Sequence, residues 1–147
     1  MSNNLRFKTS KFIDETYRVS FKFNNKTYFG FKGDTLASAL LANGIHLVGR
    51  SFKYHRPRGI MTSGSEEPNA IIQLHDNSSR TEPNVRATEV EIYEGLVASS
   101  QNCWPSVNFD IGGINNLLSP ILPAGFYYKT FMLSLIHISE PTRHCTI

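Results

Sequence analysis

Residues 17–31 carry the feature that most constrains the fold, an alternation of apolar and polar side chains interrupted by two asparagines. Apolar side chains fall on every second position: Tyr17, Val19, Phe21 and Phe23. A period of two residues is typical of a strand with one buried face, so YRVSFKFNN (Tyr17–Asn25) is predicted to be such a strand. Asn24-Asn25 favours a turn, and KTYFGF (Lys26–Phe31) is then the returning strand of a hairpin.

A helix is predicted directly after this hairpin. Gly33-Asp34 precedes an apolar stripe at helical spacing, made of Leu36, Ala39, Leu40 and Ile45. We expect Asp34 to be the N-cap, since a carboxylate accepts hydrogen bonds from the free N–H groups of the first turn. Asn43-Gly44 is a typical helix stop.

The remaining segments predict further strands and an irregular arm. Asn69–Asp76 is a short strand, Asn77–Asn84 a turn or loop, and Val85–Tyr93 another strand. From Gly95 onward the chain is rich in Gly, Pro and aromatic residues, with one short helix around Ile114–Leu118. A hairpin, a helix, a long loop and then more strands is the order of an α+β fold of the β-grasp, ferredoxin-like type.

The densest chemistry lies in RSFKYHRPRG (Arg50–Gly59), which holds four full cations, one histidine and two aromatic side chains. Four interpretations stay open: its charges pair internally with Glu66 and Glu67, it forms a subunit or domain interface, it contacts a cofactor, or it binds nucleic acid. The interface interpretation names these residues: Arg50, Lys53, Tyr54, His55, Arg56, Arg58, Glu66 and Glu67. For His55 a structural hydrogen bond is favoured over general-base catalysis, because no nucleophile is indicated nearby.

Composition limits the other classes. The chain has 147 residues and a formal net charge of only +3, so total charge is weak support for nucleic-acid binding. Cys103 and Cys145 are far apart, which predicts neither a disulfide framework nor a cysteine-rich metal site and favours a reducing cytoplasm. Cys103 is expected to be a packed thiol. Neither a secretory signal nor a membrane-spanning segment is predicted.

Several long motifs point to a known family: GRSFKYHRPRGI, GSEEPNA, EPNVRAT and LPAGFYYKTFM. From about Tyr17 to Met132 the chain resembles the N-terminal end of the alpha subunit of heterotetrameric sarcosine oxidase. The resemblance implies a flavin-dependent parent complex that oxidatively demethylates sarcosine and passes the one-carbon unit to tetrahydrofolate. It implies FAD, FMN, NAD and tetrahydrofolate in that complex, and the beta, gamma and delta subunits as partners beside the other alpha-subunit domains.

This chain departs from a cluster-bearing relative, since such a domain needs four thiolates, mostly in the loop after the helix. The corresponding segment, Arg50 to Glu67, has no cysteine, so no iron–sulfur cluster and no metal site are expected. No G-x-G-x-x-G occurs, so the chain is expected to stop before the dinucleotide-binding domain. No catalytic residue is predicted, and the residues of any cofactor contact are unknown.

The last fifteen residues are interpreted as an artefact. LSLIHISEPTR (Leu133–Arg143) matches the conceptual translation of a transposase adapter used in sequencing libraries. Residues 133–147 are therefore excluded from the functional argument. The predicted organisation is an extension over residues 1–16, a ferredoxin-like domain over 17–98, an arm over 99–132, and the adapter read-through.

Together these observations predict a catalytically inert N-terminal piece of a sarcosine oxidase alpha subunit that has a structural or interface role. Neighbouring enzymes with this architecture act on other secondary amines, so the substrate follows from the family name and not from any residue. The alternative is a free-standing β-grasp module whose basic loop, residues 50–58, binds an acidic protein or nucleic acid.

Overall fold

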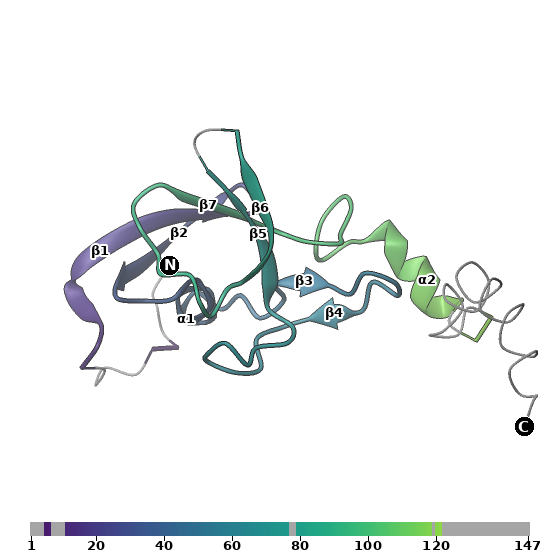
Figure 1. Cartoon of the computed structure of the whole chain (residues 1–147), viewed down its shortest axis with the longest axis horizontal. Helices are drawn as coiled ribbons and strands as arrows, with labels where there is room; N and C mark the ends of the chain where they lie inside the picture. The colour runs from purple at the N-terminus through teal and green to yellow at the C-terminus, as the bar shows by residue number, and fades with distance from the viewer. Residues whose placement is uncertain (1–4, 7–10, 77–78, 119, 122–147) are drawn as a thin grey trace, which may run out of the picture.

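The computed structural model describes residues 5–6, 11–76, 79–118 and 120–121. Six elements build the main body: β1 (Asp14–Phe23), β2 (Lys26–Lys32), α1 (Leu36–Ala42), β5 (Ile71–His75), β6 (Thr81–Arg86) and β7 (Leu96–Ser100). The strands form one mixed sheet in the order β2-β1-β7-β5-β6 (Figure 1). β1 and β7 run parallel, whereas the other three pairs are antiparallel. This topology confirms the expected α+β, β-grasp class.

The predicted hairpin is confirmed. Asn24 and Asn25 have φ of 50° and 63°, as a type I′ turn requires, and Phe23 pairs with Lys26 across it. The expectation that Tyr17 shares the buried face is wrong, because its side chain is 66% exposed. The register of β1 shifts between Asp14 and Arg18, and a shift of register changes which side chains face the core.

The helix is confirmed, but its N-cap is not the predicted one. The Thr35 hydroxyl caps α1 by accepting from the Ser38 N–H at 3.2 Å. The Asp34 side chain is fully buried and points back to the N-terminal segment, where Arg6 donates to it at 2.8 Å. Helix α1 ends at Ala42 with Asn43 as its C-cap, and Gly44 follows with φ of 78°, as expected of a stop.

The strand predicted over Val85–Tyr93 is wrong. β6 spans Thr81–Arg86, so it also takes in half of the segment expected to be a loop. The residues after β6 serve α1 instead: the carbonyls of Val90 and Ala87 accept from the N–H groups of Leu36 and Ala37 at 2.7 and 3.0 Å. These are first-turn donors that have no partner within a helix, so the segment is committed to capping α1.

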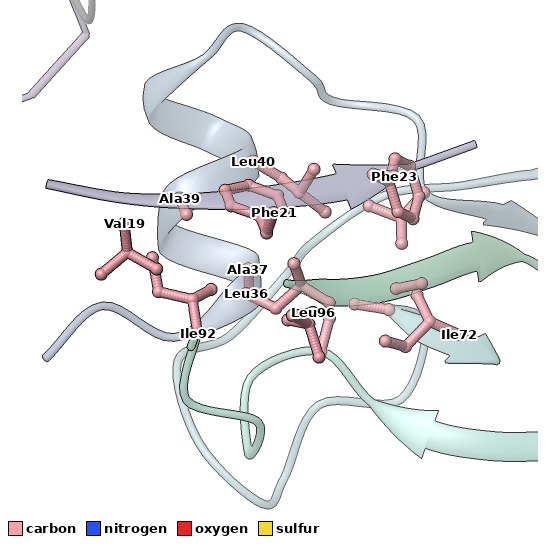
Figure 2. Close-up of a cluster of buried hydrophobic side chains, with 14 residues drawn as sticks. Val19, Phe21, Phe23, Leu36, Ala37, Ala39, Leu40, Ile72, Ile92 and Leu96 are labelled. Atoms are coloured by element: carbon pink, nitrogen blue, oxygen red, sulfur yellow. The ribbon is translucent and has the colours of Figure 1, made fainter. Parts of the chain in front are cut away.

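The central strand β7 was not predicted, since no strand pattern was recognised after Gly95 and the arm was expected to begin at residue 99. β7 lies between β1 and β5 and joins the two strand pairs, β1 with β2 and β5 with β6, into one sheet. The hydrophobic core then lies between the sheet and α1, and Figure 2 shows its side chains converging from β1, α1, β5 and β7. Its largest fully buried apolar members are Phe21, Leu36, Leu40, Ile72 and Leu96.

Beyond β7 the chain leaves the body. The 3-10 helix η1 (Ile111–Gly113) and helix α2 (Ile114–Leu117) follow, and α2 confirms the short helix predicted there. A separate two-stranded ladder, β3 (Gly49–Arg50) with β4 (Pro57–Arg58), extends on the same side (Figure 1). Within the described ranges, the structure holds no helix with the length and apolar character to cross a membrane. The adapter-like segment 133–147 and the arm beyond Ile121 lie outside the described residues.

Candidate functional site

The basic loop, residues 50–58, is a closed turn between β3 and β4. The Ser51 N–H donates to the Arg56 carbonyl at 3.0 Å, and the Ser51 carbonyl accepts from the His55 N–H at 3.1 Å. The Ser51 hydroxyl accepts from the Arg56 N–H at 2.9 Å. His55 has φ of 52°, a left-handed conformation that histidine tolerates better than most side chains. These hydrogen bonds fix the backbone conformation of the loop and therefore the positions from which its side chains extend.

Asp110 connects this loop to the arm. One carboxylate oxygen lies 2.6 Å from Nδ1 of His55 and 3.8 Å from Nε of Arg50. The other accepts from the N–H groups of Trp104 and Gly112 at 3.0 and 3.2 Å. We call Arg50, His55 and Asp110 the clasp. His55 was expected to make a structural hydrogen bond, and it makes one to Asp110 within the clasp.

The clasp is partly buried, with 14%, 21% and 1% of the Arg50, His55 and Asp110 side chains exposed, and its charge is stabilised locally. Burial alone would raise the pKa of Asp110, but the Trp104 N–H, the His55 ring and the Gly112 N–H outweigh it and hold that pKa below its usual value. A Cβ at Gly112 would overlap the His55 ring, so only glycine allows this approach. Arg50 completes the attachment by donating to the Val107 carbonyl at 2.8 Å.

The tip of the loop contacts α2. Arg56 donates to the Asn116 side chain at 2.9 Å, and the Asn115 side chain donates to the Lys53 carbonyl at 3.3 Å. The cations of Lys53 and Arg56 lie 5.3 and 4.8 Å from the centre of the Tyr54 ring. Three of the predicted interface residues are thus gathered at the tip, beside Asn115 and Asn116 of α2.

Pairing of the loop cations with Glu66 and Glu67, one of the four open interpretations, does not hold for Arg50 and Arg58. Arg50 pairs with Asp110, and Arg58 donates to the Asn69 side chain at 2.9 Å. Glu66 is exposed on the surface. A carboxylate inside a tight loop is satisfied by the backbone N–H groups closest to it, and this is the arrangement at Glu67.

Glu67 is an organising residue that the sequence did not distinguish from Glu66. Its buried carboxylate accepts from four backbone N–H groups, those of Met61, Thr62, Asn69 and Ala70, at 2.6 to 3.2 Å. Burial alone would raise its pKa, but these donors outweigh burial and lower the pKa to about 2. Glu67 therefore fixes the segment that leads from the basic loop to β5.

Replacing Asp110 by alanine is expected to release the arm while leaving the body folded. The variant removes the acceptor of the Trp104 and Gly112 N–H groups and leaves Arg50 without its carboxylate. We expect amide hydrogen exchange over residues 104–117 to accelerate by about tenfold or more, with α1 unchanged. Glu91→Ala, which removes an exposed carboxylate, is the control. Unchanged exchange in the arm of the Asp110→Ala variant would show that the clasp does not hold it.

The remaining candidate chemistry among the described residues is metal ligation and thiol reactivity. In the described part of the chain, no group of three or more His, Cys, Asp or Glu side chains is placed to hold a metal ion. Cys103 is partly buried, and burial, reinforced by the charge of Asp110, raises the pKa of its thiol. A raised pKa lowers the thiolate fraction, which agrees with the expected packed thiol.

Residues 16–103 match the family described as the 2Fe-2S iron-sulfur cluster binding domain. The residues present do not fit such a cluster. Four thiolates are needed, whereas the sequence holds two cysteines, and none of them lies between Arg50 and Glu67. In the structure, that segment is organised by the clasp and by Glu67.

Curated relatives confirm the resemblance found in the sequence. The "Sarcosine oxidase subunit alpha" of Rhizobium meliloti (strain 1021) is 62% identical over 120 residues, which is 82% of this chain and 12% of that protein. The proteins of the same name from Corynebacterium sp. strains U-96 and P-1 are 45% and 37% identical over 47% and 59% of this chain. The match spans only 12%, 7% and 9% of the lengths of these three relatives.

One solved structure is also similar, the crystal structure of L-proline dehydrogenase from P. horikoshii. Its TM-score is 0.47 at 24% identity, and the match covers 60% of this chain and 16% of that one. The family match covers more than half of the chain, and the sheet topology agrees with it. The chain belongs to the 2Fe-2S iron-sulfur cluster binding domain family.

Proposed function

We propose that this chain is the N-terminal domain of a sarcosine-oxidase-type alpha subunit, where it serves as a structural, cluster-free docking domain. The observation that carries the proposal is the 62% identity to the Rhizobium meliloti alpha subunit over 82% of this chain. The basic loop and arm, joined by the clasp, are the proposed docking unit. The parent reaction is then oxidative demethylation of sarcosine, with transfer of the one-carbon unit to tetrahydrofolate.

The chemistry of the described residues supports a structural role. The side chains that sequence reasoning could have assigned to catalysis, His55 and Glu67, are both held in hydrogen-bonded positions within the fold. FAD, FMN, NAD and tetrahydrofolate are proposed for the parent complex and not for this chain. The beta, gamma and delta subunits, and the other alpha-subunit domains, are the proposed partners.

An activity assay tests the proposal. The purified 147-residue chain, supplied with FAD, FMN, NAD and tetrahydrofolate, is expected to show no sarcosine-dependent oxygen consumption. A full-length Rhizobium meliloti alpha subunit, in which this chain without residues 133–147 replaces the matching segment, is expected to give an active enzyme with its partner subunits. Turnover by the isolated chain would refute the structural role, and an inactive but folded chimera would refute the assignment to this subunit.

The alternative, a free-standing module that binds an acidic protein or nucleic acid, rests on the four cations of the basic loop. All four are engaged within the domain: Arg50, Arg56 and Arg58 contact Asp110, Asn116 and Asn69, and Lys53 lies over the Tyr54 ring. Titration with a fluorescent single-stranded oligonucleotide at two salt concentrations separates the two ideas. Tight binding that weakens steeply with salt would favour the module, because released counterions dominate such binding.

A further inference from the structure

The arm carries several large apolar side chains that are exposed to solvent. Trp104, Phe109 and Leu117 are 70%, 70% and 81% exposed, and Ile114 is 58% exposed. We call these four residues the arm ridge. Single exposed apolar residues are ordinary on protein surfaces, but four within fourteen consecutive positions mark a contact surface.

Polar side chains of the same segment are already engaged by the basic loop. Asp110 bonds to His55, Asn115 to the Lys53 carbonyl, and Asn116 to Arg56. In α2, Ile114 and Leu117 are three positions apart and therefore share a face. The polar contacts hold the arm in place before anything binds, which reduces the ordering cost of association.

The charged residues on and beside the ridge indicate what kind of partner surface would be complementary to it. Between Trp104 and Ile121 the only charged residue is Asp110, and its side chain is 1% exposed and paired within the clasp. The adjoining loop, residues 50–58, contributes four cations and no carboxylate. A complementary partner therefore presents an apolar surface bordered by carboxylates, since opposite potentials meet across interfaces.

We propose that the arm ridge docks onto the remainder of the full-length alpha-subunit polypeptide, at an apolar surface with an acidic border. This inference rests on the proposed function. The relative from Rhizobium meliloti is matched over only 12% of its length, so most of that polypeptide is available as the occupant. A partner surface on the same polypeptide is also favoured over a separate protein, because the covalent connection gives it a high effective concentration at the ridge.

Hydroxyl-radical footprinting with mass spectrometry tests the inference. The probe is applied to the isolated 147-residue chain and to the full-length chimera that carries residues 1–132 of it. Oxidation of Trp104, Phe109 and Leu117 is expected to fall about fivefold or more in the chimera, because covered side chains react slowly. Phe12, whose side chain is 91% exposed and whose backbone lies beside Gly33 between β2 and α1, is the internal control and is expected to react equally in both.

A variant adds a second measurement within the chimera. Leu117→Asp is expected to restore the oxidation of Trp104 and Phe109, whereas the matched change Phe12→Asp is expected to leave their protection unchanged. Both side chains are exposed, so neither change removes a core contact. Circular dichroism of the isolated variants checks that the body remains folded.

The outcomes separate the two proposals. An active chimera with a reactive ridge overturns the docking surface and keeps the proposed function. A protected ridge in an inactive chimera keeps the docking surface and overturns the proposed function. A reactive ridge in an inactive chimera overturns both proposals. Protection of the isolated chain that increases with its own concentration, or on addition of an oligonucleotide, would assign the ridge to a second copy or to nucleic acid and overturn the inference.

Discussion

Replacing Asp34 by asparagine is expected to lower the free energy of unfolding by about 3–5 kcal/mol. The buried carboxylate accepts from both terminal nitrogens of Arg6, from the Phe31 N–H at 2.9 Å and from the Ser38 hydroxyl at 3.0 Å. Arg6 is itself largely buried, with 11% of its side chain exposed, so the variant leaves an uncompensated charge. Urea unfolding followed by circular dichroism measures the loss.

Thr35→Ala is the comparison for this variant, because it removes the hydroxyl that caps α1. The expected cost of losing the cap is about 1 kcal/mol. A cost for Asp34→Asn that is no larger than the cost for Thr35→Ala would mean that Asp34 acts only as a local helix cap. The account of Asp34 as the anchor of the N-terminal segment would then be wrong.

Replacing Glu67 by glutamine is expected to cost about 3 kcal/mol near neutral pH. Ionised Glu67 is stabilised by four backbone donors, which lower its pKa from 4.5 to about 2 in the folded chain. A carboxyl with a depressed folded pKa stabilises the fold fully above its unfolded pKa. This contribution is lost as the pH falls from about 4.5 towards 2.

The pH dependence makes this prediction specific. Unfolding free energies at about pH 7 and about pH 3 should differ less in Glu67→Gln than in the unchanged chain, because the variant has no such carboxyl to protonate. Glu66→Gln is the matched control, since Glu66 is exposed and next in sequence. Equal pH dependence in the two variants would show that the backbone donors do not hold Glu67 ionised.

The parts of the fold that are set by residues adjacent in the sequence were predictable. The hairpin from β1 to β2 and the C-cap of α1 at Asn43 follow from alternation, turn residues and a glycine. β7 was missed because LVASS has no alternation of its own, and its place as a strand depends on pairing with β1 and β5. The wrong strand over Val85–Tyr93 has the same origin, since those residues cap α1.

The candidate site was located by sequence but not resolved. A concentration of cations marked the basic loop, yet His55 and Asp110 are 55 residues apart, and nothing local connects them. Glu66 and Glu67 are equivalent in sequence, and the fold buries only Glu67. Side-chain roles of this kind depend on which backbone N–H groups and which arm residues are brought near.

The clasp explains how a member of this domain family can order its loop without cluster ligands. In cluster-bearing relatives, thiolates hold iron at the loop after the helix. Here Arg50, His55 and Asp110 connect the loop to the arm through hydrogen bonds, and Gly112 allows their close approach. A loop held in this way presents a surface, which agrees with docking rather than electron transfer.

The measurement that tests this account most directly is the iron and inorganic sulfide content of the purified 147-residue chain after anaerobic reconstitution. The account predicts no stoichiometric iron or sulfide and no visible absorption that dithionite bleaches. Two irons and two sulfides per chain, with a reducible visible spectrum, would contradict it. The domain would then be an electron carrier, and the clasp could not be the device that replaces the cluster.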